Sequence, residues 1–330
     1  IYFTILEKGK GKFVKLGDIA EVRFGIKTGA NEFFYVEDVT DKIDFISIKD
    51  KIVNLKEIKS IDDIKRKNLR IIRNTKTSDY WLIEEEFLKP VIKSPRECKS
   101  IIIKPEDLKY KVIMCHKSKD ELKNENAFIL DYIEWGEKEG FNNRPTCKSR
   151  KYWWDLGLWD ISKNVLPMFE NERKYCFYNQ VNAYIDAALY WVYRKINIDD
   201  MILNLFLNSS LIALWKELLC RSPEGLGALQ MKVYHYNNMS IPLINKLNSQ
   251  NKINNIFNKF ANKEIPTIFI EFGFDPDKPI REQEPNPLPD RKELDDIVFD
   301  AIELTEDERK EVYWAVAELV QNRLKKAKSV

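Results

Sequence analysis

The sequence has few of the residues that build disulfide frameworks and metal centres. Its 330 residues include five cysteines and two histidines, and no C-x-x-C pair occurs. An odd number of widely spaced cysteines argues against a disulfide scaffold, and two isolated histidines argue against a zinc site. Cys115 and His116 are adjacent, but neighbouring residues of a strand point to opposite faces, which does not suit a nucleophile and its base. We interpret both as structural.

Signatures of common catalytic sites are also missing. No G-x-G-x-x-G, G-x-x-x-x-G-K-[ST], H-E-x-x-H or G-x-S-x-G motif is present, so dinucleotide, nucleotide, zinc-protease and serine-hydrolase sites lack their first requirement. One formal match remains, because Pro289 and Asp290 precede Glu308 and Lys310 at a spacing that a metal-dependent nuclease can use. Asp290 lies at a predicted helix start and Glu308 inside a capped helix. We therefore interpret the acidic pair as capping residues rather than metal ligands.

Long apolar runs are absent as well. The best candidate, residues 201–220, is interrupted by polar and charged side chains, so it predicts a buried helix that Asp199 or Asp200 can cap. No secretory signal opens the chain, which starts at Ile1 without an initiator methionine. We expect a cytoplasmic fragment of a longer protein, with no membrane partner.

Charge is nearly balanced overall but unevenly distributed. The sequence carries 54 basic and 52 acidic residues, a net charge of +2. Residues 281–311 contain twelve acidic and five basic residues, whereas residues 148–154 place three cations beside three aromatic side chains. A net excess this small does not establish nucleic-acid binding, which requires cations gathered on one face. We expect the acidic tail to pack on another domain or subunit rather than to face phosphates.

The remaining pattern predicts a mixed α/β protein (α+β) in two parts. Residues 1–245 alternate short segments rich in β-branched and aromatic residues with turns and a few helices, which predicts a mixed sheet with helices. Residues 246–330 predict a helical C-terminal region. Within it, five prolines make residues 273–290 an extended connector.

Two helices have clear boundary signals. Residues 126–140 show helical spacing of apolar side chains and end at Gly140, a residue that suits a helix C-terminus. Thr305 and Glu308 have the spacing of a capping box, and the pattern predicts a final helix that runs to about Lys326.

A glycine-flanked basic turn stands out near the start of the chain. Gly25 and Gly29 bracket Lys27 and Thr28, and the aromatic segment 33–36 follows. Glycines permit positive φ and close approach of a ligand, so an ammonium, a hydroxyl and free amides can together receive a phosphate. The flanking residues predict a strand, a turn and a second strand.

Several stretches together carry a family resemblance. They are, in chain order, LGDIAEV at 16–22, the turn at 25–36, VIMCHK at 112–117, YIEWG at 132–136, RPTCKSRK at 144–151, WWDLG at 153–157, LGALQMKVY at 226–234, IPL at 241–243, DRKELD at 290–295 and LKKA at 324–327. This set resembles the target-recognition and C-terminal region of adenine-specific (N6) DNA methyltransferases of restriction-modification systems. The segment that ends in IPL also resembles recognition domains of type I restriction specificity subunits.

The resemblance implies a division of labour between this chain and a catalytic domain. Such methyltransferases carry an N-P-P-Y motif and a glycine-rich loop for S-adenosylmethionine, and neither is present here. The chain is therefore expected to bind no cofactor and to catalyse no methylation by itself. An upstream domain of the same parent protein would hold S-adenosylmethionine, and that parent could also have endonuclease activity. Because a methyltransferase flips its target base, a second domain must hold and select the duplex.

Three groups of residues are candidates for contact with duplex DNA. They are Lys27, Thr28, Gly29 and Asn31 in the turn; Arg144, Lys148, Arg150 and Lys151, whose nearby acidic neighbour in the sequence is Asp155; and Arg221, Ser222, Gln230 and Lys232. Cations suit phosphates, arginine also suits guanine, and an amide side chain suits adenine.

Each group also has a purely structural interpretation. The first can be a tight hairpin in which Asn31 stabilises the turn, and the second a surface loop paired with local acids. Trp153 and Trp154 are more typical of a core than of a stacking surface. For the whole chain, the alternative to DNA recognition is a protein-interaction scaffold, or a specificity subunit of a multi-subunit complex without DNA chemistry of its own. The number of subunits stays open.

Overall fold

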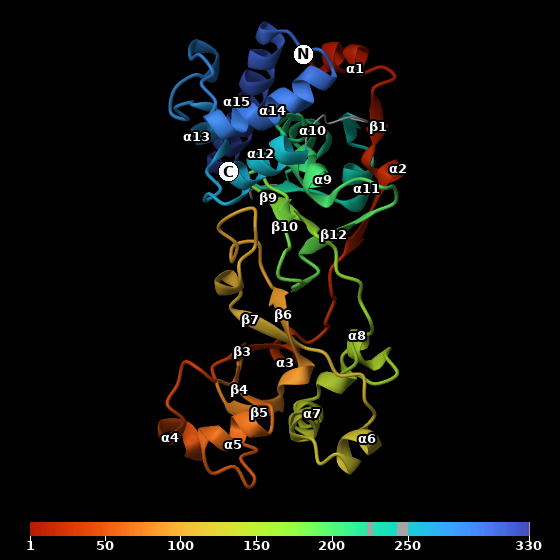
Figure 1. Cartoon of the computed structure of the whole chain (residues 1–330), viewed down its shortest axis with the longest axis vertical. Coiled ribbons are helices and arrows are strands. Elements are labelled where there is room, and N and C mark those ends of the chain that lie inside the picture. The colour runs from red at the N-terminus through yellow and green to blue at the C-terminus, as the bar shows by residue number, and fades with distance from the viewer. Residues whose placement is uncertain (223–226, 243–249, 330) are drawn as a thin grey trace.

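A computed structural model of the chain describes residues 1–222, 227–242 and 250–329, which form two lobes along the long axis (Figure 1). We call residues 1–25, 92–109, 161–222, 227–242 and 250–329 the upper lobe, and residues 26–91 and 110–160 the lower lobe. Both chain ends belong to the upper lobe. The protein is mixed α/β, as the sequence predicts, because helices and several separate sheets alternate along it.

A four-stranded antiparallel sheet lies at the end of the upper lobe that is next to the lower lobe (Figure 1). Its order is β10 (Phe177–Tyr178), β8 (Asn164–Pro167), β12 (Leu189–Arg194) and β2 (Ala20–Phe24). Alternate residues of β12 enter different cores, since Leu189 and Trp191 join one cluster and Tyr190 and Val192 join the other. Both faces of this sheet are therefore covered.

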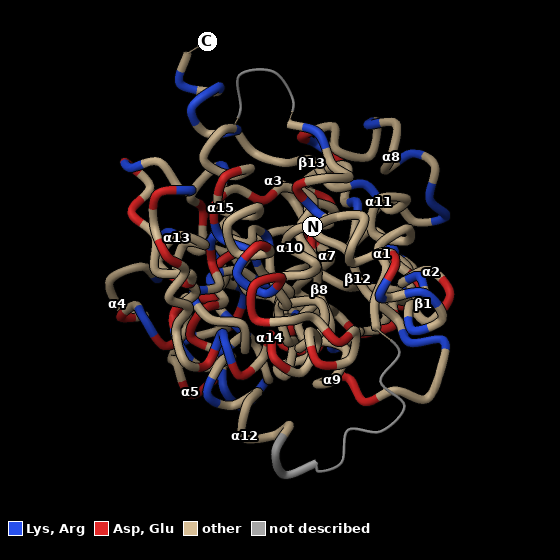
Figure 2. The backbone as a smooth tube through the Cα atoms, turned by 90° about the horizontal axis from the view of Figure 1, so that it is seen from above, with Lys and Arg blue, Asp and Glu red and all other residues tan. Residues whose placement is uncertain are grey.

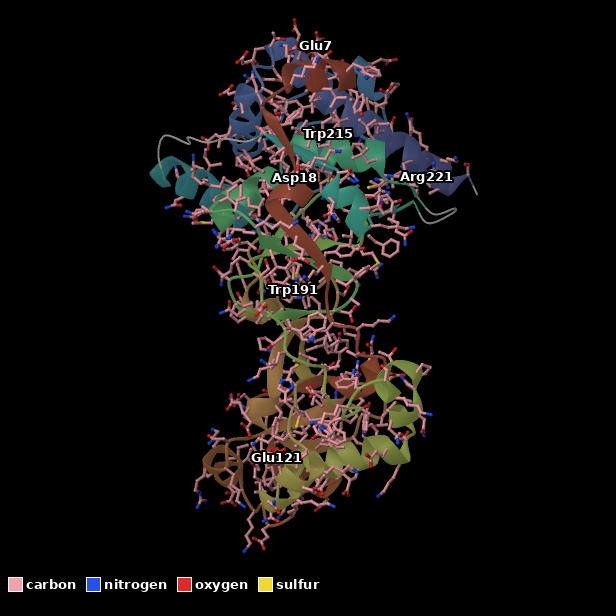
Figure 3. The ribbon with its side chains drawn as sticks, turned by 90° about the vertical axis from the view of Figure 1, so that its right-hand side faces the viewer. Glu7, Asp18, Glu121, Trp191, Trp215 and Arg221 are labelled. Carbon is pink, nitrogen blue, oxygen red and sulfur yellow. The ribbon has the colours of Figure 1, made fainter. Side chains whose placement is uncertain are left out.

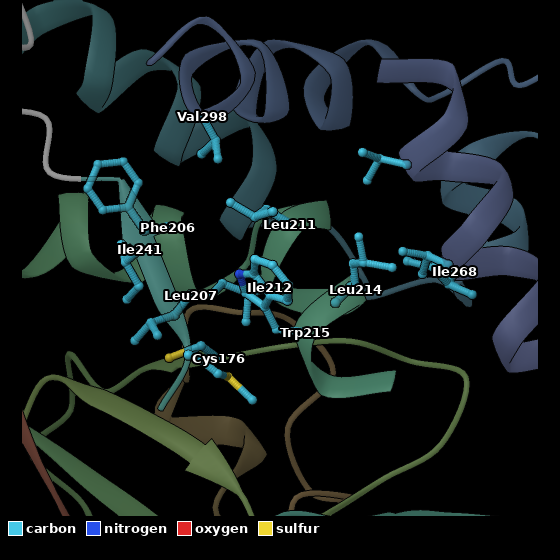
Figure 4. Packing of buried hydrophobic residues seen from close by; sticks show 14 of the residues in the cluster. Cys176, Phe206, Leu207, Leu211, Ile212, Leu214, Trp215, Ile241, Ile268 and Val298 are labelled. Atoms are coloured by element: carbon cyan, nitrogen blue, oxygen red, sulfur yellow. The ribbon is translucent and has the colours of Figure 1, made fainter. Parts of the chain in front are cut away.

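Helices cover the two faces of that sheet. They are α1 (Tyr2–Lys8), α2 (Leu16–Ile19), α9 (Asp200–Leu207), α10 (Ser210–Leu219), α11 (Val233–Asn237), α12 (Gln250–Ala261), α13 (Ile268–Phe272), the 3-10 turn η5 (Ile280–Glu282), α14 (Pro289–Ala301) and α15 (Glu306–Lys328). Figure 4 shows Leu211, Ile212 and Trp215 of α10 packed among Ile241, Ile268 and Val298. The C-terminal helices thus share one core with the N-terminal residues Leu16 and Val22. The expected boundary at residue 245 lies outside the described residues.

The sequence predicted a single helix over the apolar segment 201–220, but the structure has two. Asp199 caps α9, and Ser209 starts a second helix by accepting a hydrogen bond from the Ile212 amide. The two helices meet at 56°. In the described ranges no single helix is both long and apolar enough to cross a bilayer, although this bent pair reaches that length and composition.

The lower lobe is organised around a six-stranded sheet. Its order is β11 (Tyr184–Ile185), β6 (Leu88–Ile92), β7 (Tyr110–Ile113), β3 (Tyr35–Asp38), β4 (Leu69–Asn74) and β5 (Tyr80–Glu84). Strand β11 comes from the upper lobe and pairs in parallel with β6, while the other pairs are antiparallel. The sheet therefore joins the two lobes through backbone hydrogen bonds.

Short helices and turns surround this sheet. They are α3 (Asn31–Phe34), α4 (Phe45–Ile48), η1 (Lys49–Lys51), α5 (Ile61–Arg66), η2 (Glu85–Phe87), α6 (Lys119–Asn124), α7 (Phe128–Lys138), η4 (Phe141–Asn143) and α8 (Pro145–Lys148). A further 3-10 turn, η3 (Pro105–Asp107), belongs to the segment 92–109 of the upper lobe. The predicted helix at 126–140 is confirmed as α7, and Gly140 follows it with a left-handed φ of 77°.

Two small antiparallel pairs complete the architecture. Strand β1 (Phe13–Lys15) pairs with β14 (Ser240–Pro242), and β9 (Phe169–Glu170) pairs with β13 (Leu229–Gln230). The β9 and β13 pair matters for the site below, because it carries Gln230.

Candidate nucleic-acid interface

The glycine-flanked turn is a crossing between the lobes and not the hairpin that the sequence predicted. Strand β2 before it belongs to the upper sheet, whereas β3 after it belongs to the lower sheet. The helix α3 lies between the turn and β3, because Phe33 and Phe34 are drawn into the core of the lower lobe. The turn is therefore held at both ends by different lobes.

Gly25 packs directly against the backbone of Ile185 and Asp186. A Cβ at this position would lie 2.4 Å from the carbonyl oxygen of Asp186, so no other residue fits without movement. The next amide, of Ile26, donates to the Ile185 carbonyl at 2.7 Å. The Tyr35 hydroxyl donates to the Asp186 carboxylate at 2.7 Å, and burial together with that carboxylate raises the pKa of Tyr35. This junction is rigidly hydrogen-bonded.

The polar groups of the turn bind one another. Thr28 is 2% exposed, and its hydroxyl donates to the Asn31 side chain and accepts from the Ala30 amide at 3.2 Å. Gly29 has a φ of 77°, and a Cβ there would lie 2.6 Å from Thr146 of α8. Asn31 therefore stabilises the turn, while Lys27 remains exposed at its surface.

Arg150 of the α8 region holds the same turn from the other side. Its guanidinium donates to the carbonyl oxygens of Lys27 at 2.8 Å, Thr28 at 2.7 Å and Trp153 at 3.1 Å. It also lies over the Phe34 ring, 5.5 Å from the centroid. The Arg150 guanidinium is therefore engaged by backbone carbonyls of the protein and does not face outward.

Arg144 is also used internally. It binds both carboxylate oxygens of Glu32, at 2.8 and 3.2 Å, and its side chain lies over the Phe141 ring. The hydrogen bond from Arg144 lowers the pKa of Glu32. The acidic partner is thus 112 residues away in the sequence, whereas Asp155, the acidic neighbour along the chain, binds His116 at 2.6 Å.

The lysines of this region face solvent. Lys27, Lys148 and Lys151 are exposed, and within the residues that the structure describes none of the three forms an ion pair. Figure 2 shows basic residues gathered at α8. Trp153 and Trp154 are buried, so their interpretation as core residues is confirmed. One stretch of sequence therefore separates into inward arginines and tryptophans and outward lysines.

The third predicted group converges on one cavity of the upper lobe. Arg221, Ser222, Gln230 and Lys232 all line a surface cavity of about 850 Å³ between the end of α10, β13 and α11. The Gln230 amide donates to the Arg221 carbonyl at 3.0 Å, which fixes the two residues relative to each other. Among the described residues, neither Arg221 nor Lys232 forms an ion pair.

A buried network of charges supports the strands beneath this cavity, and no local pattern in the sequence indicates it. Glu217 binds Lys174 at 2.7 Å and Arg323 of α15 at 2.9 Å, while Glu170 of β9 binds Lys216 at 2.8 Å. Burial acts to raise the pKa of Glu217, but Lys174 and Arg323 outweigh it and hold that pKa below its usual range.

Arg323 also connects the C-terminal helix to the cavity. Its guanidinium donates to the carbonyl oxygen of Gly227 and, at 3.1 Å, to the side chain of Asn171. Gly227 leads into β13, and Glu170 belongs to the paired strand β9. The network therefore fixes the strand pair that presents Gln230.

The two basic regions lie on the same side of the molecule. Figures 1 and 2 both place α8 of the lower lobe and α11 of the upper lobe on that side, and Figure 3 shows Arg221 at its margin. Residues 148 and 232 are far apart in the sequence, so tertiary structure alone brings these outward cations to a common side.

The formal nuclease match does not form an acidic site. Asp290 forms an ion pair with Lys263, and Glu308 binds Lys8 at 2.6 Å. The capping box of Thr305 and Glu308 is confirmed at the start of α15, but Asp290 does not cap α14, which begins at Pro289 after Leu288. In the described ranges no group of three or more histidine, cysteine or acidic residues is arranged to hold a metal ion.

Two solved structures of restriction-modification enzymes have a fold similar to that of this chain. Over 98% of the chain, the fold is similar to that in the crystal structure of the type IIG restriction endonuclease BpuSI, with a TM-score of 0.54 and 11% identity. Over 96%, it is similar to the type IIL restriction-modification enzyme MmeI, solved in complex with DNA, with a TM-score of 0.52 and 10% identity. This chain spans 32% and 36% of the lengths of those two chains.

Sequence comparison gives the family. No curated protein matches the chain. Residues 67–271, however, match the family described as the C-terminal domain of type II methyltransferase M.Eco57I. This match covers most of the lower lobe together with β8 to α13 of the upper lobe. The chain therefore belongs to the family of type II methyltransferase M.Eco57I C-terminal domains.

Proposed function

We propose that this chain recognises a specific sequence in duplex DNA on behalf of an adenine-N6 methyltransferase of a restriction-modification system. The observation that carries the proposal is the common side shared by two groups of outward cations. Lys27, Lys148 and Lys151 lie in the lower lobe, and Arg221 and Lys232 lie in the upper lobe. Cations gathered on one face are the electrostatic footprint of a polyanion site.

The two groups differ in what they can recognise. Exposed lysines are flexible point charges that suit phosphates, which carry no sequence information. Arg221 and Gln230 are instead fixed to each other through the backbone and line a cavity. Arginine and glutamine bind guanine and adenine edges in bidentate fashion. We therefore assign phosphate contact to the lower lobe and base reading to the upper cavity.

Catalysis is assigned to the parent protein. The sequence carries neither an N-P-P-Y motif nor a glycine-rich loop for S-adenosylmethionine, so we place that cofactor, and the transfer of its methyl group, in a catalytic domain outside this chain. We also propose a cytoplasmic location for the parent, since restriction-modification acts on DNA. Family membership and the two enzymes of similar fold support this assignment.

Salt-dependent binding of the whole chain to fluorescent duplex DNA tests the proposal. We expect the logarithm of the binding constant to fall linearly with the logarithm of salt concentration. Replacing Lys27, Lys148 and Lys151 together by alanine should reduce that slope by about 0.9 for each phosphate that the variant no longer neutralises. The matched control replaces Lys59, Lys65 and Lys67, which are exposed at the far end of the lower lobe, and should leave the slope unchanged.

Selection from a random duplex pool tests base reading. The wild-type chain should enrich a defined site. Gln230→Ala should relax one position of that site by roughly tenfold, or about 1.4 kcal/mol, within the range of about 1–3 kcal/mol for a bidentate contact. A folded chain that binds no duplex even at low salt would contradict the proposal and favour a protein-interaction scaffold.

A further inference from the structure

A second hollow lies beside the upper cavity and has an aromatic lining. Its volume is about 480 Å³, and its lining includes Phe24, Tyr190, Tyr234 and Asn237. It shares Tyr234, Gln230 and Lys232 with the cavity described above. We call it the aromatic hollow. Because the two spaces have walls in common, a ligand strand that crosses the cavity reaches the hollow directly.

Two aromatic rings of the hollow are unusually exposed. Phe24, on the edge strand β2, is 51% exposed, and Tyr234 of α11 is 56% exposed. Tyr190 supports Phe24 from behind, with ring centroids 4.9 Å apart, and is itself fixed by a hydrogen bond from its hydroxyl to the Met231 carbonyl at 2.9 Å. Such rings are pre-organised to stack on a flat partner.

Asn237 provides a hydrogen-bond acceptor that has no donor among the described residues. Its amide oxygen is buried and accepts no hydrogen bond from any described residue. The Asn237 side chain already packs against Gly17 of α2. A Cβ added at Gly17 would lie only 3.0 Å from the Asn237 Cβ, so there is little room on that side. A buried acceptor without a donor costs about 1–3 kcal/mol. Because Asn237 lines the hollow, a ligand N–H group there would remove that penalty once the amide oxygen turns toward it.

The cations beside the hollow indicate that the ligand is part of an anionic strand. Lys232 lies on the wall that the hollow and the cavity share, and Arg221 lies in the cavity itself. Among the described residues neither is neutralised by a carboxylate. Aromatic faces, a hydrogen-bond acceptor and adjacent cations together complement a nucleotide within a strand, whose base is flat and whose phosphates are anionic.

We propose that the aromatic hollow binds an unstacked nucleobase that carries an exocyclic amino group, presented by the DNA that the chain recognises. The base would stack on Phe24 or Tyr234, its amino group would donate to the Asn237 oxygen, and its phosphates would lie near Lys232. Adenine, cytosine and guanine have such an amino group at their pairing edge, and thymine does not. This inference rests on the proposed function, because the strand must first be held by the outward cations.

Duplexes with a single unpaired base test the inference on the whole chain. Three duplexes of one sequence are compared: fully paired, with an extra adenine, and with an extra thymine. The wild-type chain should bind the adenine bulge at least fivefold more tightly than the paired duplex, since one stacked base is worth this much or more. Phe24→Ala combined with Tyr234→Ala should abolish that preference, measured as the ratio of the affinity for the bulged duplex to the affinity for the paired duplex.

Asn237→Ala separates the hydrogen bond from stacking. It should reduce the preference for adenine over thymine bulges while a preference for bulges over paired DNA persists. The conservative variants Phe24→Tyr and Tyr234→Phe keep both rings and should behave as the wild type. Ile270→Ala removes apolar surface elsewhere, at a residue of α13 that is 58% exposed, and controls for the loss of apolar surface alone. Thermal unfolding of every variant verifies the fold.

The outcomes distinguish this inference from the proposed function. Salt-dependent duplex binding with equal affinity for bulged and paired DNA would overturn the aromatic hollow as a base site and leave DNA recognition intact. A bulge preference that survives the double alanine replacement would overturn it as well. Absence of binding to every DNA would overturn both.

Discussion

The turn region of the lower lobe and the cavity region of the upper lobe use their cations in a similar way. In each, an inner layer of cations binds the protein itself and an outer layer faces solvent. Arg144 and Arg150 form the inner layer below the turn, and Lys174, Lys216 and Arg323 form it below the cavity. A cation's presence in the sequence therefore does not reveal which layer it joins.

The two inner layers differ in burial and in partners. Arg144 and Arg150 are partly exposed, and Arg150 binds backbone carbonyls. The upper network is almost completely enclosed, since Glu217 is 2% and Arg323 is 9% exposed. Removing one partner of an enclosed pair strands an uncompensated charge, whereas water replaces a partner at the surface. We expect the upper layer to be far less tolerant of change.

Removal of the Glu217 charge should give the largest effect. Glu217→Gln leaves Arg323 buried without its carboxylate and Lys174 with only the more distant Glu170, at 3.5 Å. The free energy of unfolding should fall by about 3–5 kcal/mol. Urea unfolding measures it. Glu318→Gln is the matched control, because Glu318 pairs with Arg281 at 2.9 Å on the exposed side of α15, and this change should cost less than about 1 kcal/mol. Equal destabilisation of the two variants would erase the distinction between the layers.

Removal of Arg150 should have an intermediate effect. Arg150→Ala deletes charge-assisted hydrogen bonds to the carbonyls of Lys27, Thr28 and Trp153, at a cost of about 2 kcal/mol. Lys148→Ala, two residues away in the outer layer, should change stability by less than about 0.5 kcal/mol. If denaturant unfolding shows the reverse order, the assignment of the two residues to inner and outer layers is wrong.

The smallest effect is the pH dependence of the pair between Glu32 and Arg144. The hydrogen bond from Arg144 lowers the folded-state pKa of Glu32 below 4.5. This contribution is present at neutral pH and is lost as the pH falls through the folded-state pKa. Because both side chains are about a third exposed, we expect less than about 1 kcal/mol.

A pH series of unfolding measurements on the wild type and Arg144→Gln isolates this contribution. The stability difference should be largest at neutral pH and should shrink below pH 4.5, the unfolded reference value. A difference that stays constant down to the acid limit would indicate that Arg144 acts through its packing on Phe141 rather than through Glu32.

Local signals in the sequence predicted several elements well. The apolar spacing predicted α7, Gly140 follows just after its end, and the capping box at Thr305 marks the start of α15. The same local logic failed where packing intervened. The segment 201–220 has the composition of one helix, but Ser209 starts a second helix inside it. At 25–36 the residues suit a hairpin, yet the flanking strands belong to different sheets.

The candidate site shows the same division. Residue type and spacing were enough to select Lys148 and Lys151, and Gln230 with Lys232, as candidates, and the structure gathers the latter pair at one cavity. Nothing in the local sequence distinguishes Arg150 from Lys151, although the first is bound inside and the second is exposed. The aromatic hollow was missed because Phe24 and Tyr234 are 210 residues apart and meet only through the fold.

The sequence by itself determined the helix boundaries set by caps and glycines, and the family resemblance. Only the tertiary structure decided which cations are available to a ligand. The physical reason is that an arginine is neutralised by whichever carboxylate or carbonyl the fold brings within about 3 Å. For Arg144 that carboxylate is 112 residues away, and for Arg323 it is 106 residues away. The cations that remain outside define the surface we propose for DNA.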